Sequence, residues 1–216
     1  MLKAVIFDFD YTLGDSTKGI VLCMNHAFAQ MGYPSQEVEP IKKTVGRRLQ
    51  DAFHILTGNE DEDKAEEFTI LFKEKANEVM TAASELYPGV EEMLDKLQKA
   101  GLKTAVVTTK MRFRVEDILK KYDASALIDK IVGSDDVKIE KPNPEGLLWT
   151  MDYFGLDKSE VLYVGDSFID AKTAENAGVN FAAVLTGTTT KEEFDNYKYV
   201  FLGKNVLDVY AYVMER

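Results

Sequence analysis

The feature that most constrains the fold is a short apolar run, Ala4–Phe7, followed at once by two carboxylates, Asp8 and Asp10. Such a run of β-forming residues predicts a strand buried on both faces, as in a parallel sheet. A nearly extended chain points residues i and i+2 the same way, so both carboxylates can face one pocket at the strand's carboxyl end. Two anions this close repel unless a cation joins them. The pair indicates either a reactive site or a solvated turn. Motifs elsewhere in the chain are needed to decide between these two interpretations.

Beyond residue 87, strand and helix patterns alternate, and several helix patterns stop at a glycine such as Gly101 or Gly178. This alternation predicts an α/β fold, a Rossmann-like doubly wound parallel sheet covered by helices on both faces. Pro88 is expected in the first turn of its helix. The expected strands are 103–108, 129–132, 161–164, 180–184 and 199–202, and the expected helices are 88–100, 111–122, 144–154, 168–177 and 205–215.

Residues 15–82 carry helical patterns and little strand character, so they interrupt the alternation after the first strand. Ser16 is expected to cap the first of these helices. We interpret the stretch as an all-α domain inserted over the carboxyl ends of the strands, in a core formed by residues 1–14 and 83–216. The expected helices of the insert are about 17–31, 36–44, 47–56 and 61–80.

Charge and composition limit the partners. The net charge of −11 repels nucleic acid and anionic membranes, so an anionic ligand would need a locally positive site. There is no apolar run of the roughly 18 residues that a membrane span needs. The first residues lead straight into a strand, which predicts no signal peptide, and the single cysteine, Cys23, fits a reducing compartment. We therefore expect a cytoplasmic protein that binds neither nucleic acid nor membrane.

Further reactive side chains follow the expected strands. Thr108, Thr109 and Lys110 stand at a strand-to-helix junction, where hydroxyls can donate to phosphate oxygens or simply cap the helix. Lys141 stands in a proline-stiffened loop, where it could neutralise a phosphoryl group or be solvated. These residues favour phosphate chemistry only in combination.

The stretch Gly165-Asp166-Ser167-Phe168-Ile169-Asp170 is the last of these groups. Gly165 is expected to allow a tight turn off a buried strand. Asp166 then projects from the strand end, and Asp170 lies four residues on, at the start of a helix. The two carboxylates could stabilise the helix N-terminus, or they could be oxygen ligands for a hard cation such as Mg²⁺.

Taken together and in this order, these residues resemble the motifs of the haloacid dehalogenase (HAD) superfamily of hydrolases over nearly the whole chain. The helical insert is similar to the cap of the branch that contains phosphoglycolate phosphatase and β-phosphoglucomutase. The stretches 87–90, 133–136 and 177–178 also resemble sequences of this branch. The four motifs are Asp8-x-Asp10-x-Thr12, Thr108, Lys141 and Gly165-Asp166-x-x-x-Asp170.

The resemblance implies a role for each matching residue. Asp8 would be the nucleophile that takes the phosphoryl group, and Asp10 the general acid for the leaving oxygen and then the base for water. Mg²⁺ would be held by Asp8, the backbone carbonyl of Asp10 and Asp166, with Asp170 a ligand or the support of one. Residues implied to contact the substrate are Thr108, Thr109, Lys110 and Lys141.

Two regions bear on the substrate. Tyr11 stands where the family usually has glycine, so substrate preference does not carry over with the motif. The loop 44–49 resembles the specificity loop of the branch, and Arg47 or Arg48 could pair with a second anionic group or be a solvated helix start. We expect the insert to close over substrate on hinges near 13–16 and 81–87.

We expect a Mg²⁺-dependent phosphatase that hydrolyses a small phosphorylated metabolite, with phosphoglycolate one candidate, as a monomer or weak dimer. Dehalogenases and phosphonatases of the superfamily lack the second motif aspartate, so the presence of Asp10 favours phosphoester chemistry. The alternatives are a β-phosphoglucomutase-like phosphomutase, for which His54 is too far along the insert to match, and a pyrophosphatase. A non-catalytic phosphate-binding module is a further alternative from a different class.

Overall fold

The computed structural model describes residues 1–215, which fall into two compact units. The larger unit comprises Met1–Gly14 together with the chain from Leu86 onward, and the smaller unit comprises Asp15–Glu85. No helix in the described part of the chain is long and apolar enough to cross a membrane. Each unit has hydrophobic core residues of its own.

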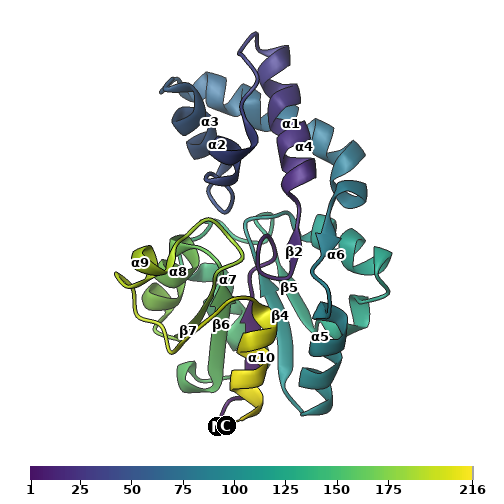
Figure 1. Ribbon diagram of the computed structural model, residues 1–216, viewed down its shortest axis with the longest axis vertical. Helices are drawn as coiled ribbons and strands as arrows, with labels where there is room; N and C mark the ends of the chain where they lie inside the picture. Colours follow the sequence, from purple (N-terminus) through teal and green to yellow (C-terminus); the bar gives the residue numbers. More distant parts are fainter. Residues whose placement is uncertain (216) are drawn as a thin grey trace. The chain divides into compact units, whose positions relative to one another are not determined.

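The larger unit is built on a six-stranded parallel sheet in the order β5-β4-β1-β6-β7-β8 (Figure 1). The first strand lies near the middle, where Phe7 pairs with Val106 of β4 on one side and Val164 of β6 on the other. This arrangement confirms the predicted α/β fold with a parallel sheet. The strands are β1 (Ala4–Phe7), β4 (Lys103–Val107), β5 (Lys130–Val132), β6 (Val161–Gly165), β7 (Asn180–Val184) and β8 (Phe201–Gly203).

Helices cover both faces of this sheet, as the unbroken apolar run of β1 predicts. Val5 and Phe7 pack with side chains of α5 (Val90–Lys99), α6 (Arg112–Lys121) and α10 (Val206–Met214). Ala4 and Ile6 point to the opposite face, where they pack with α7 (Glu145–Phe154), α8 (Phe168–Ala177) and α9 (Lys191–Phe194). The strand is therefore buried on both sides, and its polar successors are left at the sheet's edge.

The smaller unit is all-helical and packs around aromatic side chains. Phe53 lies between Phe28, Tyr33 and Phe68, with ring centroids 5.5 Å from those of Tyr33 and Phe68. Cys23 is fully buried in the same cluster, as expected for a core thiol. The helices are α1 (Thr17–Gln30), α2 (Val38–Lys42), α3 (Leu49–Thr57) and α4 (Glu62–Ala83).

Two local predictions differ from the structure for identifiable reasons. Pro88 is not in the first turn of α5, because Gly89 takes a left-handed conformation with φ +86° and becomes the N-cap. Ser16 is the N-cap residue of α1, as expected, but its side chain makes no capping hydrogen bond. The N–H of Thr17 is instead bonded by the Asp15 carboxylate at 2.7 Å, while the Ser16 hydroxyl accepts from Ser84 at 2.8 Å.

Several short elements are absent from the sequence-based prediction. Two two-residue strands, β2 (Gly14–Asp15) and β3 (Glu85–Leu86), pair with each other where the chain passes between the units. The helix α9 and two 3₁₀ turns, Ser125–Leu127 and Lys158–Glu160, are also new. Elements this short contain too few residues to show a period.

Candidate active site

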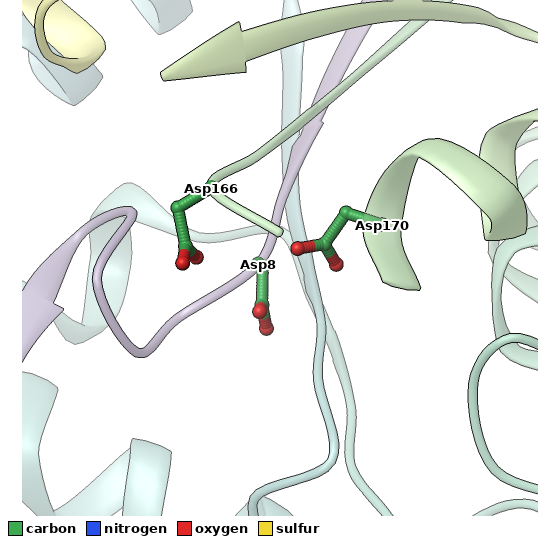
Figure 2. Close-up of side chains that lie close together, drawn as sticks. All are labelled: Asp8, Asp166 and Asp170. Carbon is green, nitrogen blue, oxygen red and sulfur yellow. The ribbon is translucent and has the colours of Figure 1, made fainter. Parts of the chain in front are cut away.

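Three carboxylates converge at the carboxyl end of the sheet (Figure 2). Asp8 follows β1 and Asp166 follows β6, and these two strands are parallel neighbours, so both residues leave the sheet at the same edge. Asp170 comes from the first turn of α8. One carboxylate oxygen from each residue lies within 4.8 Å of the others, and all three residues are buried.

Asp8 is held through both of its oxygens. Oδ1 accepts a hydrogen bond from the backbone N–H of Phe9 at 2.7 Å, and Oδ2 lies 3.0 Å from the Lys141 ammonium. Burial raises the pKa of Asp8 to about 6, although the charge of Lys141 opposes this shift. The carboxylate is thus fixed in orientation but short of compensating positive charge.

Lys141 reaches two of the three carboxylates. Its Nζ lies 2.6 Å from Asp170 Oδ1 as well as 3.0 Å from Asp8 Oδ2, and it is buried. Burial alone would lower the pKa of Lys141, but the Asp170 and Asp8 carboxylates outweigh burial and raise it. Lys141 therefore remains a cation. Because it is buried, it is not the solvated lysine of the alternative interpretation.

Asp170 is surrounded by donors. Oδ1 accepts from Lys141 and from the Tyr163 hydroxyl at 2.9 Å, while Oδ2 accepts from the Ser167 hydroxyl at 2.5 Å and the Ser167 N–H at 3.1 Å. A Cβ at Gly165 would lie 2.4 Å from Asp170 Cγ. Gly165 is thus needed for this close approach, and not for the tight turn that was predicted, because it is not among the glycines with positive φ.

Asp166 is positioned by the loops around it. The Thr12 hydroxyl donates to its Oδ1 at 3.1 Å. Gly187, in the loop after β7, lies so close that a Cβ there would be 1.9 Å from Asp166 Oδ2. Burial, and then the neighbouring carboxylates of Asp170 and Asp8, raise the pKa of Asp166 well above its ordinary value. These two loops leave the carboxylate little freedom to turn away.

The charges of the cluster do not balance. Three carboxylates when ionised face one buried ammonium, that of Lys141, which leaves two negative charges in excess. Ions in a low-dielectric interior are costly unless they are compensated. All the donor atoms are oxygens, the ligands that hard divalent cations prefer. Asp8, Asp166 and Asp170 are therefore the described residues that could hold such a cation.

Asp10 faces a different partner. Its Oδ2 lies 3.0 Å from the Lys110 Nζ, and its Oδ1 is buried without a hydrogen-bond partner in the described residues. Thr108 directly follows β4 and is 5% exposed, and its hydroxyl accepts from the N–H of Lys110 at 3.2 Å. Thr109 is half-buried in the same loop. Since α6 has Met111 as its N-cap, Thr108 is not the cap of that helix.

Arg47 and Arg48 lie in the smaller unit. Arg48 forms a two-pronged ion pair with Asp51, with Nε–Oδ2 at 3.0 Å and Nη2–Oδ1 at 2.6 Å. This pair at the start of α3 supports the interpretation of Arg48 as a helix-start residue. The structure therefore brings together four of the sequence-predicted residues, Asp8, Lys141, Asp166 and Asp170. It also pairs Asp10 with Lys110, whereas the two arginines lie in the smaller unit.

Some residues of the site were missed by sequence reasoning. Tyr163 lies beneath Lys141 and Asp170, and burial together with the Asp170 carboxylate raises the pKa of its hydroxyl. A polar atom in the otherwise apolar run Val161–Val164 was the available signal. Gly187 had a weaker signal, a glycine soon after a strand end.

The sequence pattern of the haloacid dehalogenase-like hydrolases matches residues 5–184, most of the chain. The protein is a haloacid dehalogenase-like hydrolase. The matched range includes every site residue of the larger unit except the loop that carries Gly187.

Relatives within this family carry two kinds of name. Pyrophosphatase PpaX of Bacillus cereus is 31% identical over 96% of this chain and 94% of its own length. A phosphoglycolate phosphatase of Vibrio parahaemolyticus is 32% identical over 82% of this chain and 81% of its own. A crystal structure described as a haloacid dehalogenase-like hydrolase of Bacteroides fragilis has a TM-score of 0.93 at 38% identity, covering 97% of this chain and 100% of that one.

Proposed function

We propose that the protein is a Mg²⁺-dependent phosphatase that hydrolyses a small phosphorylated metabolite through an aspartyl phosphate on Asp8. The observation that carries the proposal is the setting of Asp8, a buried carboxylate oriented by Phe9 N–H and Lys141 beside two further carboxylates. Phosphoryl transfer needs in-line positioning and neutralisation of charge more than covalent machinery. The names of the relatives support the same reaction class.

In the first half-reaction, an Asp8 oxygen attacks phosphorus and the bond from phosphorus to the leaving oxygen breaks. The electron pair stays on the leaving oxygen, which takes a proton from Asp10. In the second half-reaction, Asp10 takes a proton from water as the water oxygen attacks phosphorus. The bond between Asp8 and phosphorus then breaks, which releases phosphate and restores both carboxylates.

The other residues of the cluster serve charge and orientation. Lys141 lies where it can neutralise the phosphoryl group on Asp8, and Thr108 follows the neighbouring strand, where its hydroxyl can contact a phosphoryl oxygen. Asp8, the Asp10 carbonyl and Asp166 would hold Mg²⁺, with Asp170 as a ligand or as the residue that orients Lys141. When bound there, the cation would supply the positive charge that the cluster lacks and would act as a Lewis acid toward the phosphoryl group.

The smaller unit is proposed to act as a cap domain that selects the leaving group, with the remaining chain, near 1–14 and 83–216, as the catalytic core. Arg47 or Arg48 would pair with a second anionic group on the substrate, such as a carboxylate or a second phosphate. An Arg47→Ala variant should weaken binding of doubly anionic substrates more than that of p-nitrophenyl phosphate. An equal change in KM for both substrates would remove Arg47 from the proposal.

Two substrates have specific support. Phosphoglycolate and pyrophosphate are both small anions with a phosphoryl group, and relatives at 31–32% identity are named for each. Pyrophosphate would require a phosphate as the leaving group, whereas phosphoglycolate would require an alkoxide. The two differ in the bond that breaks, so the substrate decides whether the enzyme acts on a monoester.

The deciding experiment measures phosphate release with Mg²⁺ across a panel of phosphoglycolate, pyrophosphate, sugar phosphates and nucleoside monophosphates. The variant Asp8→Asn should lose activity by on the order of 10³-fold or more, since no covalent intermediate can form. The exposed Asp117→Asn is the matched control and should retain full activity. Activity that survives Asp8→Asn would refute the aspartyl-phosphate route, and a folded, metal-binding protein with no activity would favour a phosphate-binding module.

A further inference from the structure

Lys110 contacts Asp10, the residue proposed above to transfer the proton. The Lys110 Nζ lies 3.0 Å from Asp10 Oδ2, and the two side chains are 5% and 12% exposed. The ammonium also lies over the Phe9 ring, 5.9 Å from its centroid. Lys110 is therefore paired with a residue that is distant from it in the sequence, and the motifs alone do not predict this pair.

The backbone around Asp10 is already fixed by a tight turn. The carbonyl of Phe9 accepts hydrogen bonds from three successive N–H groups, and the N–H of Tyr11 donates to the carbonyl of Gly14 at 2.7 Å. Within such a turn, the rotation of the Asp10 side chain is the freedom that is left. The three donors to Phe9 O are Thr12 N at 3.2 Å, Leu13 N at 2.9 Å and Gly14 N at 3.1 Å.

The two oxygens of Asp10 are not equivalent. Lys110 engages Oδ2, whereas Oδ1 is buried and has no hydrogen-bond partner within the described part of the chain. A buried polar oxygen without a partner is costly, and most buried polar atoms in proteins have a hydrogen-bond partner. Oδ1 is thus the oxygen placed to carry the proton and to meet the oxygen of a leaving group.

We propose that Lys110 is a positioning residue that holds Asp10 Oδ2, so that Oδ1 delivers its proton to the leaving-group oxygen. This inference rests on the proposed phosphatase function. As the bond from phosphorus to the leaving oxygen breaks, the proton moves from Asp10 Oδ1 to that oxygen, and Lys110 neither gains nor loses a proton. Misplacing a proton donor by even a small distance costs rate more than binding.

A series of aryl phosphates separates positioning from substrate binding. p-Nitrophenyl phosphate and phenyl phosphate carry the same charge, but the nitrophenolate is a stable anion whereas phenolate, with a pKa of about 10, needs a proton as it leaves. A lysine that only binds the phosphoryl group affects both substrates equally. A lysine that positions the acid matters mainly for phenyl phosphate.

The experiment measures kcat and KM for both substrates with Mg²⁺ in the wild type and in variants of Lys110. We expect Lys110→Met to lower kcat on phenyl phosphate about tenfold more than kcat on p-nitrophenyl phosphate, with KM little changed. Lys110→Arg, which keeps the charge, should recover part of the loss. The exposed Lys99→Met, which loses only a surface pair with Asp95, is the matched control and should behave as wild type.

A double variant ties the effect to Asp10. Asp10→Asn should show the same selectivity for the leaving group, and adding Lys110→Met to it should cause no further selective loss. If Lys110→Met does not fold by circular dichroism, Lys110→Gln removes the charge with a polar side chain and serves in its place.

Two results would overturn the assignment. An equal fall in kcat on both substrates, or a raised KM with unchanged kcat, would make Lys110 a substrate contact or a structural residue. A wild type that releases phosphate neither from the two esters nor from any compound of the substrate panel would instead refute the phosphatase function itself. In that case Asp8→Asn and the wild type would be equally inactive. This outcome distinguishes a failure of the phosphatase function from a failure of the role proposed for Lys110.

Discussion

The two units of this protein bury different kinds of side chain. Asp8, Lys141, Asp166 and Asp170 are all buried in the larger unit, linked by ion pairs and hydrogen bonds. Within residues 15–85 the buried polar side chains are all hydroxyls, such as Thr69, which donates to its own helix backbone at 2.9 Å. One unit thus holds charge in its interior, whereas the other holds a cluster of aromatic rings.

The difference shows where chemistry can reside. Burying an ion is unfavourable unless other charges or donors compensate it, so a buried cluster with an excess of carboxylates is expected only where a ligand completes it. An aromatic core is stabilised by packing alone and has no need of a ligand. We therefore expect changes in the larger unit to act through charge and metal, and changes in the smaller unit to act through stability.

The largest expected effect on stability comes from removing the cation of the larger unit. Lys141→Met leaves Asp8 and Asp170 buried without their ammonium, and such uncompensated charge costs about 3–5 kcal/mol. Urea unfolding of the metal-free protein measures this loss. Lys99→Met, which removes an ion pair with an exposed lysine, is the control and should cost less than about 1 kcal/mol. Equal losses of unfolding free energy in the two variants would show that the buried ion pairs of Lys141 stabilise the protein no more than a surface ion pair does.

A cavity in the smaller unit should cost about 3 kcal/mol and leave metal binding alone. Phe53 is fully buried among Phe28, Tyr33 and Phe68, so Phe53→Ala removes a large packed ring. Urea unfolding and titration calorimetry with Mg²⁺ measure the two properties on one sample. A change of more than a few fold in Mg²⁺ affinity would show that packing in the smaller unit also affects metal binding in the larger unit.

A smaller and more selective effect is expected at Gly187. A Cβ there would overlap Asp166 Oδ2, and Gly187 is not among the residues with positive φ, so Gly187→Ala disturbs the carboxylate and not the backbone. Mg²⁺ affinity by calorimetry should fall about tenfold, the loss typical of a displaced supporting group. The neighbouring exposed residue provides the control Thr188→Ala, which should bind Mg²⁺ as wild type does. Unchanged affinity in Gly187→Ala would mean that Asp166 is not held by this loop.

The smallest effect is a pH dependence of the metal-free protein. Asp8 loses its proton at about 6 in the folded state and near 3.8 in the unfolded chain. Between these values the folded state binds more protons, so stability falls as the pH rises from about 4 to about 6, by about 1 kcal/mol per pH unit at most. Urea unfolding without metal measures the slope. Asp8→Asn should reduce the slope but not remove it, because burial also raises the pKa of Asp166. An unchanged slope in that variant would assign the dependence to Asp166 or another group.

Local patterns were sufficient for the motifs and for the longer helices and strands. The run Ala4–Phe7 is buried on both faces as its composition predicts, and the helix 168–177 and the strand 180–184 have the expected bounds. These features depend on periods of two or about 3.6 residues, which can be read within a few positions. Bounds set by a single backbone angle, such as that of Gly89, could not be read in this way.

The sequence by itself determined the α/β class, the order of the motifs and the carboxylates that leave β1 and β6. Only the tertiary structure decided which side chains those carboxylates meet. Thr12 bonds Asp166 from 154 positions away, Lys141 meets Tyr163 from 22 positions away, and Lys110 pairs with Asp10. No local period encodes such contacts, because they arise when parallel strands bring the ends of distant segments to one edge of the sheet.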